Sequence, residues 1–352
     1  MKIVTGSTAA NLPACVATIG CFDGVHRGHQ YLIEQVHNIA KARGLASCLI
    51  TFTSHPRQVL DTDYRPRLLT CLSQKIECFE HSPIEYCVLL PFTKELSLLS
   101  ACEFMRILHE VYNVQALFVG YDHHFGHNQE EEFEEYCQYG KELGMRVMQS
   151  RALVEDGTSI SSTLIRSCLL AGDIKNANAY LGYSYYLSGR VVDGKKVGRT
   201  LGFPTANIEP LCAEKLLPAT GVYAVYVYVG KERYAGMLNI GSCPTVNGNE
   251  QSVSVEVHIL NFQRDIYQEL IKIEFVEYLR SEVKFESVEK LTWQLQQDKE
   301  VVKNLLHQIK YLDKKFVHVY RYHVHVFVNI SGFFSMIVQY LLIVFPFGQS
   351  VH

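Results

Sequence analysis

The feature that most constrains the fold is a series of short apolar runs in the first half of the chain. The runs are CVATI from Cys15, LASCLITF from Leu45, EYCVLLPF from Glu85, ALFVG from Ala116 and MRVMQS from Met145. Helical or loop sequence separates each run from the next, which is typical of a parallel sheet with crossover helices. The first half is therefore predicted to be an α/β domain.

One crossover helix is predicted directly after the first run, from Gly28 to Lys41. Its apolar residues recur at the 3.6-residue period of one helix face. These residues are Leu32, Ile33, Val36, Ile39 and Ala40. The helix face predicts that His29 lies in the first turn.

The pattern changes near Tyr183 to alternation with period two. The runs YYLSGRVVDG, GVYAVYVYVG, RYAGMLNIG, SVSVEVHIL and IKIEFVEYL are broken by glycine-bearing turns, which predicts a small antiparallel β-barrel. A helix from Ser287 to about Leu312 is expected to close this part. We expect domains at residues 1–182 and 183–312, tightly docked because no Pro- or Ser-rich linker separates them, and an apolar extension at 313–352.

The charge balance and the cysteine content indicate which partners and which cellular compartment to expect. The 33 basic and 36 acidic residues give a net charge of -3, so no general attraction to nucleic acid or to an anionic membrane is expected. Eleven cysteines without a CxxC pair are interpreted as reduced thiols of a cytoplasmic protein, and no secretory signal is expected at the start. Self-association is compatible with the sequence.

The end of the chain is unusual because residues 322–352 contain no Asp, Glu, Lys or Arg. The segment VFVNISGFFSMIVQYLLIVFPF is long enough to cross a bilayer. Polar residues such as Asn329 and Gln339 interrupt it, and Pro346 ends it. We therefore interpret it as an extension and not as a membrane anchor.

The stretch GCFDGVHRGHQ, from Gly20 to Gln30, joins the first apolar run to the predicted helix. Such a corner aims backbone N–H groups and the positive end of the helix dipole at a ligand, so it favours an anion. His26 and His29 add donors that could become cationic as charge builds on an α-phosphate. Zinc is the rival ligand, but no third protein ligand accompanies the pair, and two surface histidines are the bland alternative.

A second group of polar residues, ISSTLIRSCL from Ile160, lies at another predicted strand-to-helix boundary. Ser161, Ser162 and Thr163 offer hydroxyls, although Ser161 could serve only as a helix cap. Taken with the histidine pair, the group indicates a clamp for a triphosphate. Arg166 is expected on that triphosphate and not in a structural ion pair.

The second half carries a glycine-rich stretch, GRVVDGKKVGRTLGFPTANI, whose Gly194, Gly198 and Gly202 could form a flexible loop over phosphates. The Thr205 hydroxyl and the Asn207 amide could contact Mg²⁺ and a phosphate. Glu256 alternates with the apolar Val255 and Val257, so it leaves the strand on the opposite face and could act as a general base. A glycine-rich hairpin and a solvated glutamate are the bland alternatives.

Together these motifs resemble known families. GCFDGVHRGH with ISSTLIR resembles the nucleotidyltransferase superfamily, and TFTSHPRQVL with FVGYDHHFGH resembles its FAD synthetase branch. The second half, with PTANI, GVYAV, LNIGSCPTVNG, VEVHIL and LRSEVKF, resembles riboflavin kinase. Residues 2–312 are thus similar to the bacterial bifunctional riboflavin kinase/FAD synthetase family, a Rossmann-like nucleotidyltransferase domain followed by a kinase barrel with a C-terminal helix.

The resemblance implies an ATP-dependent phosphorylation of riboflavin to FMN, then adenylyl transfer from a second ATP to FMN, giving FAD and pyrophosphate. ATP would be the co-substrate and Mg²⁺ the cofactor. Residues implied to serve ATP in the first domain are Gly20, Phe22, Asp23, Gly24, His26, His29, Ser161, Ser162, Thr163 and Arg166. In the second domain Thr205 and Asn207 would bind MgATP beneath the glycine loop, with Glu256 as the kinase base. Residues implied to lie near the flavin are His55, Pro56, Asp122 and Arg280.

Two departures from the family leave alternatives open. Leu164 stands where the family often has arginine, and His123 and His124 stand where it often has Phe-Arg. One alternative is a monofunctional riboflavin kinase with a weak or vestigial adenylyltransferase domain. Another is a flavin-binding or sensing protein with vestigial sites, against which the intact PTAN motif and Glu256 argue, because a binder needs no base.

The first prediction concerns the extension. Because every motif precedes Leu312, a chain truncated after Leu312 should still form FAD from riboflavin and ATP, which chromatography of the flavin products would detect. A truncated chain that folds but loses either activity would show that the extension takes part in catalysis.

Overall fold

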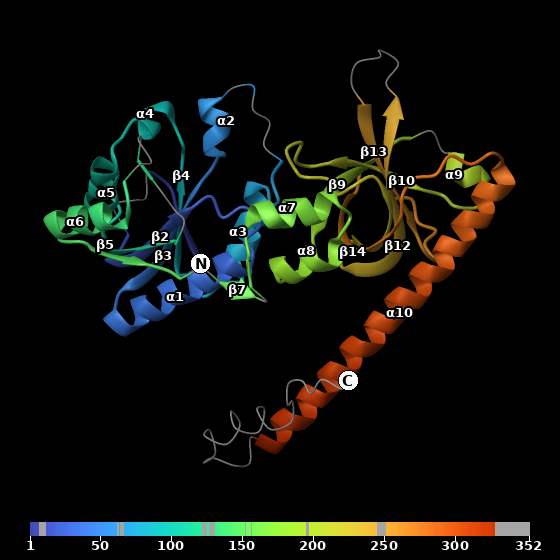
Figure 1. Ribbon diagram of the computed structural model, residues 1–352. Helices are drawn as coiled ribbons and strands as arrows, with labels where there is room; N and C mark the ends of the chain where they lie inside the picture. The colour runs from blue at the N-terminus through green and yellow to red at the C-terminus, as the bar shows by residue number, and fades with distance from the viewer. Residues whose placement is uncertain are drawn as a thin grey trace, which may run out of the picture. The chain divides into compact units, whose positions relative to one another are not determined.

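The structure is a computed structural model that describes residues 1–6, 12–61, 63, 67–121, 125–126, 131–151, 153–155, 157–194, 197–244 and 251–327. Two compact units are distinguished, Met1–Thr292 and Trp293–His352. Each unit is described by itself. The first unit contains every motif named above, and it consists of an α/β part and a barrel (Figure 1).

The α/β part is built on a six-stranded sheet with the order β1-β4-β3-β2-β5-β6, in which all neighbours are parallel. The five predicted apolar runs form five of these strands, and the short edge strand β1 was not predicted. The bounds are β1 (Lys2–Val4), β2 (Cys15–Gly20), β3 (Ala46–Phe52), β4 (Tyr86–Leu90), β5 (Val114–Val119) and β6 (Arg146–Gln149). The predicted parallel sheet is confirmed.

Helices cover both faces of this sheet because its central strands are apolar on both sides. In β2, Cys15, Ala17 and Ile19 are buried in one cluster with residues of α5 and α6, whereas Val16 belongs to another cluster with residues of α1 and α3. The helices of this part are α1 (Arg27–Arg43), α2 (Pro56–Leu60), α3 (Leu72–Glu80), α4 (Lys94–Ser97), α5 (Ala101–Glu110) and α6 (Phe133–Leu143). The predicted apolar face of α1 is confirmed, since Leu32, Ile33, Val36 and Ala40 are buried.

The second part is a closed barrel with the order β10-β13-β12-β11-β14-β9 and antiparallel neighbours throughout. The five predicted runs form five strands, and the sixth, β10, lies in the PTANI motif, which was not predicted as a strand. The bounds are β9 (Tyr186–Val192), β10 (Ala206–Pro210), β11 (Gly221–Val229), β12 (Glu232–Pro244), β13 (Gln251–Ile259) and β14 (Leu270–Arg280), with the short helix α9 (Val197–Thr200) before β10.

Two helices between the sheet and the barrel share the core of the barrel. They are α7 (Ser162–Leu170) and α8 (Ile174–Leu181), and they follow the small hairpin of β7 (Val154–Glu155) and β8 (Thr158–Ser159). The buried side chains of Ile165, Leu169 and Leu181 belong to one apolar cluster with Val225 and Phe275 of the barrel. The two parts are therefore docked through a common core, as the absence of a linker predicted.

The long helix α10 (Val288–Phe327) starts close to the predicted position but continues past Leu312, so the predicted end was wrong. The division between the two units falls inside it. Within the described residues, none of the helices combines the length and the apolar composition that a bilayer crossing needs. The remaining part of the predicted extension, residues 328–352, lies outside the described residues.

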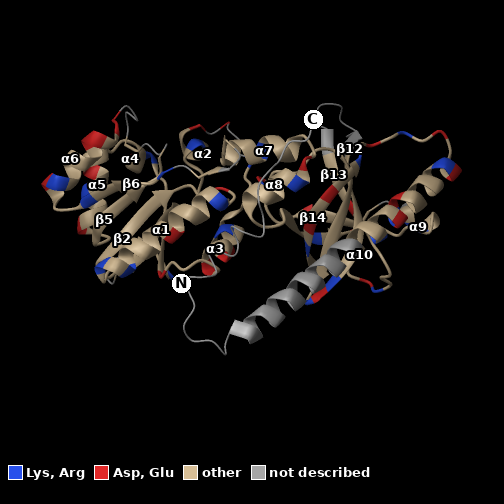
Figure 2. Cartoon of the chain, turned by 60° about the horizontal axis from the view of Figure 1, so that its bottom comes forward, with Lys and Arg blue, Asp and Glu red and all other residues tan. Residues whose placement is uncertain are grey.

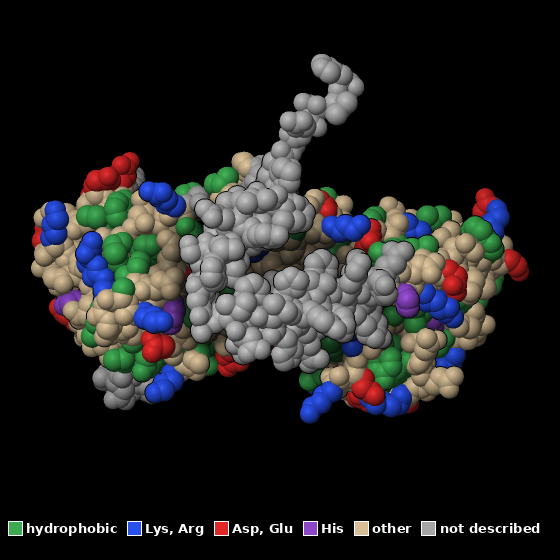
Figure 3. All heavy atoms as spheres, turned by 90° about the horizontal axis from the view of Figure 1, so that it is seen from below, with side chains coloured by type: hydrophobic (Ala, Val, Ile, Leu, Met, Phe, Trp, Pro, Cys, Tyr) green, Lys and Arg blue, Asp and Glu red, His purple; other side chains and the backbone are tan. Residues whose placement is uncertain are grey.

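Charges of both signs are mixed on the described surface. On α6, Glu134 and Glu135 lie in the first turn and Lys141 in the last, which suits the helix dipole and places red and blue segments close together in Figure 2. Figure 3 shows small groups of hydrophobic side chains between charged ones on the coloured part of its face. This mixing fits the small net charge of the chain.

One pair of cysteines contradicts the interpretation that all the thiols are reduced. Cys71 at the start of α3 and Cys212 in the loop after β10 form a disulfide across 141 positions of sequence. Other described cysteines, including Cys15, Cys21 and Cys48, are free. The sequence did not reveal the pair because only the folded chain brings the two positions together.

The second prediction tests this disulfide. Without reductant, thiol titration of the denatured chain should find two fewer thiols than its eleven cysteines. The variant Cys71→Ser should gain one reactive thiol over the unreduced native chain, because Cys212 loses its partner. Eleven titratable thiols in the unreduced native chain would contradict the pairing.

Candidate functional site

The first candidate site lies at the carboxyl end of β2, where the sheet order changes direction between β3 and β5. Ligands of open α/β sheets bind at such a switch point. Residues 21–26 connect β2 to α1, and positive φ angles at Phe22 (47°), Gly24 (84°) and Val25 (36°) fold them into a tight loop. Gly24 also approaches Leu69 so closely that an added Cβ would lie 2.8 Å from the Leu69 side chain.

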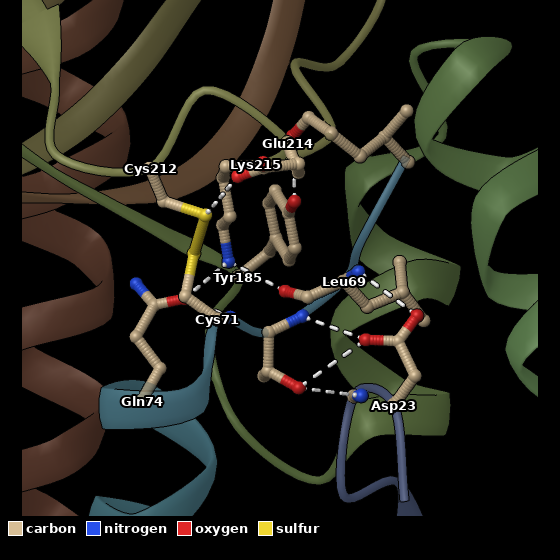
Figure 4. Close-up of a disulfide and its surroundings, with 11 residues drawn as sticks. Asp23, Leu69, Cys71, Gln74, Tyr185, Cys212, Glu214 and Lys215 are labelled. Carbon is tan, nitrogen blue, oxygen red and sulfur yellow. Dashed lines mark hydrogen bonds between the residues drawn. A yellow bond between two sulfur atoms is a disulfide. The ribbon is translucent and has the colours of Figure 1, made fainter. Parts of the chain in front are cut away.

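Asp23 holds this loop to a neighbouring segment, which we call the linking segment (residues 67–71). The residue is 5% exposed, and its carboxylate accepts hydrogen bonds from the backbone of Leu69 (3.0 Å) and of Thr70 (2.9 Å). The Thr70 hydroxyl accepts in turn from the backbone of Gly24 at 2.8 Å. Figure 4 shows the carboxylate turned toward Leu69. A buried carboxylate with several donors fixes the position of the loop.

The expectation that Arg166 makes no structural ion pair is wrong. Its Nη2 lies 2.5 Å from Asp23 Oδ2, and its Nε donates to the carbonyl of Arg67 at 3.0 Å. The positive guanidinium compensates the negative charge of the buried Asp23 carboxylate. Arg166 therefore connects α7 to both the loop and the linking segment.

His26 and His29 are brought together, as predicted, with their rings stacked at a centroid distance of 3.6 Å. His26 caps α1: its Nδ1 accepts from the backbone N–H of His29 at 3.4 Å. Burial lowers the pKa of His26 to about 4, which Asp23 opposes and Arg166 reinforces. The ring is then neutral near pH 7, and because Nδ1 accepts, its proton lies on Nε2 and can be donated. That charge on an α-phosphate makes it cationic stays a prediction.

The three hydroxyl-bearing residues at the start of α7 lie beside this loop. Ser161 caps the helix by accepting from Leu164 N at 3.2 Å, and Ser162 donates to the carbonyl of Asp23 at 2.8 Å. Thr163 is exposed in the first turn. The two strand-to-helix corners predicted from sequence therefore meet at Asp23.

A cavity of about 230 Å³ opens beside the same loop. One of its lining residues is His55, which was predicted to bind the flavin. His55 caps α2 by accepting from Arg57 N at 3.2 Å, and Pro56 is the first residue of that helix. Burial lowers the pKa of His55. Asp122, and the unusual His123 and His124, lie outside the described residues. Lys75 also lines this cavity, and no sequence motif had indicated it.

The barrel reaches the linking segment through Lys215. Its Nζ donates to the carbonyl of Leu69 at 2.5 Å and to Gln74 Oε1 at 2.9 Å, and the Cys71–Cys212 disulfide lies alongside (Figure 4). The ammonium also lies over the Tyr185 ring, 4.2 Å from the centroid. Burial lowers the pKa of Lys215 to about 7, while Asp23 acts in the opposite direction.

The second candidate site lies on the barrel, where β10 pairs with β13. Thr205 Oγ1 donates to Glu256 Oε2 at 3.1 Å, and Asn207 is the cross-strand partner of Glu256. Directly opposite residues of an antiparallel pair place their side chains on one face. Val255 and Val257 are buried while Glu256 is partly exposed, so the predicted alternation is confirmed.

Two glycines of the predicted phosphate loop lie close to Asn207 and Thr205. A Cβ at Gly194 would lie 1.9 Å from the Asn207 amide nitrogen, so a larger residue would displace that amide, and a Cβ at Gly198 would lie 3.4 Å from Thr205 Oγ1. Gly198 lies in α9, and Gly202 follows it with φ 78°. Thr205 also lines a cavity of about 470 Å³ together with Arg199, Phe262 and Tyr267.

The oxygen donors at this place fit magnesium. Thr205 and Asn207, two positions apart, present a hydroxyl and an amide oxygen, the kind of hard ligand that Mg²⁺ combines with water and substrate phosphates. Across the described residues, no cluster of three or more His, Cys, Asp or Glu side chains could hold a metal. Arg280 lies at the end of β14, where its Nη1 donates to Ser281 O at 3.1 Å.

Comparisons with known proteins match the α/β part and the barrel to two different families. The family model of FAD synthetase matches residues 8–164, and that of riboflavin kinase matches residues 181–306. A bifunctional riboflavin kinase/FMN adenylyltransferase of Pseudomonas fluorescens is 37% identical over 278 residues, which cover 79% of this chain and 88% of the relative. A protein of the same name from Escherichia coli (strain K12) is 35% identical over 303 residues, covering 85% and 96%.

A solved structure is also similar in fold. It is a crystal structure of a macrolide-efflux protein from Streptococcus pneumoniae, with a TM-score of 0.79 and 29% sequence identity. The match covers 86% of this chain and 99% of that one. The similarity therefore extends over both the sheet and the barrel.

The third prediction concerns Arg166. Arg166→Ala should lower the free energy of unfolding by about 1–3 kcal/mol, because Asp23 stays buried with one partner fewer, and denaturant titration would measure this. It should also raise the ATP requirement for converting FMN to FAD. Arg166→Lys should restore part of both, since lysine keeps the charge but not the planar fork.

The exposed Arg106 of α5 provides a matched control, because Arg106→Ala removes the same side chain from a surface position. It should change neither quantity. Unchanged stability in Arg166→Ala would mean that the ion pair with Asp23 contributes nothing to the fold.

Proposed function

The chain belongs to the bifunctional riboflavin kinase/FMN adenylyltransferase family, and on this premise we propose that its two sites act in sequence. The barrel phosphorylates riboflavin to FMN, and the α/β part transfers AMP from ATP to FMN, giving FAD and pyrophosphate. Both domain types are present in one chain, which favours this interpretation over a kinase with a vestigial partner domain. Riboflavin, FMN and ATP are the substrates.

The observation that supports the proposal most strongly is the convergence of the predicted residues at two separate places. Asp23 and His26 belong to the loop at the end of β2, and Arg166, 143 positions after Asp23, pairs with Asp23 there. Thr205 and Glu256 meet on the barrel. Each group contains the chemistry that one of the two reactions needs.

In the kinase step we assign Glu256 as the general base. Its carboxylate would accept the proton of the riboflavin 5′-hydroxyl as that oxygen attacks the γ-phosphorus of ATP, and ADP would leave with the electron pair of the broken P–O bond. Thr205 already donates to Glu256 and so fixes the direction of the carboxylate. Thr205 and Asn207 would hold Mg²⁺, which when bound neutralises charge on the phosphates, and the glycine loop would cover them.

In the adenylyl step the attacking phosphate of FMN is already ionised, so no base is required. A phosphate oxygen of FMN forms a bond to the α-phosphorus of ATP, and pyrophosphate leaves with the electron pair of the broken P–O bond. The site then needs donors for the developing charge. The Nε2–H of neutral His26, the hydroxyls of α7 and the N-terminus of α1 are such donors. Arg166 would approach the triphosphate from its place beside Asp23.

Three further assignments from the sequence stay proposals. The domain join between residues 182 and 183 falls between α8, which ends at Leu181, and β9, which begins at Tyr186. His55, Pro56 and Arg280 are assigned to flavin. We propose a cytoplasmic location, without a nucleic acid or membrane partner, and self-association is open to test.

The fourth prediction separates the two sites. Glu256→Gln keeps the size and hydrogen bonding of the side chain but removes its basicity, so riboflavin phosphorylation should fall by about 10²–10⁴-fold. Conversion of supplied FMN to FAD should survive. The double variant His26→Ala/His29→Ala should show the reverse, with FMN accumulating from riboflavin while FAD formation collapses.

Each step is assayed with its own substrate and the flavins are separated by chromatography. Circular dichroism of both variants tests whether the fold is retained. The separation of sites is refuted if the folded glutamate variant also fails on FMN, or if the folded histidine variant fails on riboflavin.

A further inference from the structure

Lys75 is a buried cation that the proposed mechanism does not use. It lies in α3, its side chain is 9% exposed, and its Nζ donates to the carbonyl of Cys21 at 2.7 Å. Cys21 is the first residue of the loop that connects β2 to α1. Lys75 therefore places a positive charge at the entrance of the anion-binding corner.

Not all N–H groups of the Lys75 ammonium are used in hydrogen bonds that the structure describes. It carries three N–H groups, of which the Cys21 carbonyl takes one, and within the described part of the chain it makes no ion pair. Burial lowers the pKa of Lys75, which means that the charged form is poorly solvated where it lies. Buried lysines are normally paired, so an anion that arrives from outside would complete its coordination.

Lys75 lines the 230 Å³ cavity, and so does His55, which is assigned to the flavin. Thr70 and Ser54 also line it. Of the residues assigned to ATP, Asp23 lines this cavity, whereas His26, Ser161 and Arg166 do not. The cavity thus adjoins the loop through Cys21 and Asp23, apart from the histidine pair and the hydroxyls of α7.

We infer that Lys75 binds the 5′-phosphate of FMN during adenylyl transfer. This inference rests on the proposed function. In-line displacement at the α-phosphorus needs the attacking phosphate and the leaving pyrophosphate on opposite sides, and a phosphate held by Lys75 in this cavity would lie apart from His26 and Arg166, which do not line it. The ammonium reduces the repulsion between the FMN phosphate and ATP and directs the nucleophile, while no proton is transferred.

The test replaces Lys75 by Gln and by Arg and measures both Michaelis constants of FAD formation. Lys75→Gln should raise the KM for FMN about tenfold or more, the usual scale for loss of a charged hydrogen bond, and leave the KM for ATP within about twofold. Lys75→Arg should recover part of the loss. The exposed Lys94 of α4 is the matched control, and Lys94→Gln should change neither constant.

A purely structural role gives a different result. If Lys75 only supports the loop through the Cys21 carbonyl, Lys75→Gln should raise both Michaelis constants together and lower Tm, and this outcome overturns the inference. Riboflavin phosphorylation by the barrel, measured in the same preparations, shows whether the variants are folded.

A measurement of FMN binding tests the inference independently of catalysis. Calorimetric titration with FMN should show weaker binding in Lys75→Gln than in the native chain, whereas titration with riboflavin, which lacks the phosphate, should be the same in both. Identical FMN titrations would refute the role of Lys75 even if FAD is formed. Failure of the native chain to form FAD, with the FMN difference preserved, would instead refute the proposed adenylyl transfer.

Discussion

The buried carboxylate of Asp23 is the interaction on which the first site depends. It accepts from the backbone of Leu69 and Thr70 and pairs with Arg166, so one side chain joins the loop after β2, the linking segment and α7. The loop and α7 carry proposed ligand-binding groups, and the linking segment holds them together. A loop with three positive φ angles would not keep its shape by local preference alone. The carboxylate supplies the fixed geometry that binding a triphosphate requires.

The linking segment extends this dependence to the barrel. Leu69 donates its N–H to Asp23 and accepts from Lys215 at its carbonyl, so the two backbone groups of one residue face different parts of the molecule. The disulfide of Cys71 with Cys212 closes the same connection covalently. The adenylyl site is therefore built partly from contacts with the barrel, although all of its proposed chemical groups belong to the first part.

Sequence patterns predicted what is local. Apolar runs with fixed periods located the strands of both sheets, and the motifs around His26 and Ser161 identified two corners that meet in the fold. Contacts that join distant positions were missed: the Cys71–Cys212 pair, the ion pair of Arg166, and the approach of Lys75 to Cys21. No spacing rule encodes such contacts, because tertiary packing alone sets their distances. The lowered pKa of His26 could not be predicted for a related reason, since burial decides it.

The common core of α7, α8 and the barrel has a consequence for how such a chain can be divided by gene fission. Ile165, Leu169 and Leu181 belong to the same buried cluster as Val225 and Phe275. A polypeptide released at the domain join would expose this apolar surface to water, at about 25 cal/mol per Å², and would lose Lys215 from the linking segment. Two genes could replace this one only if the surface on each product were redesigned as a protein–protein interface.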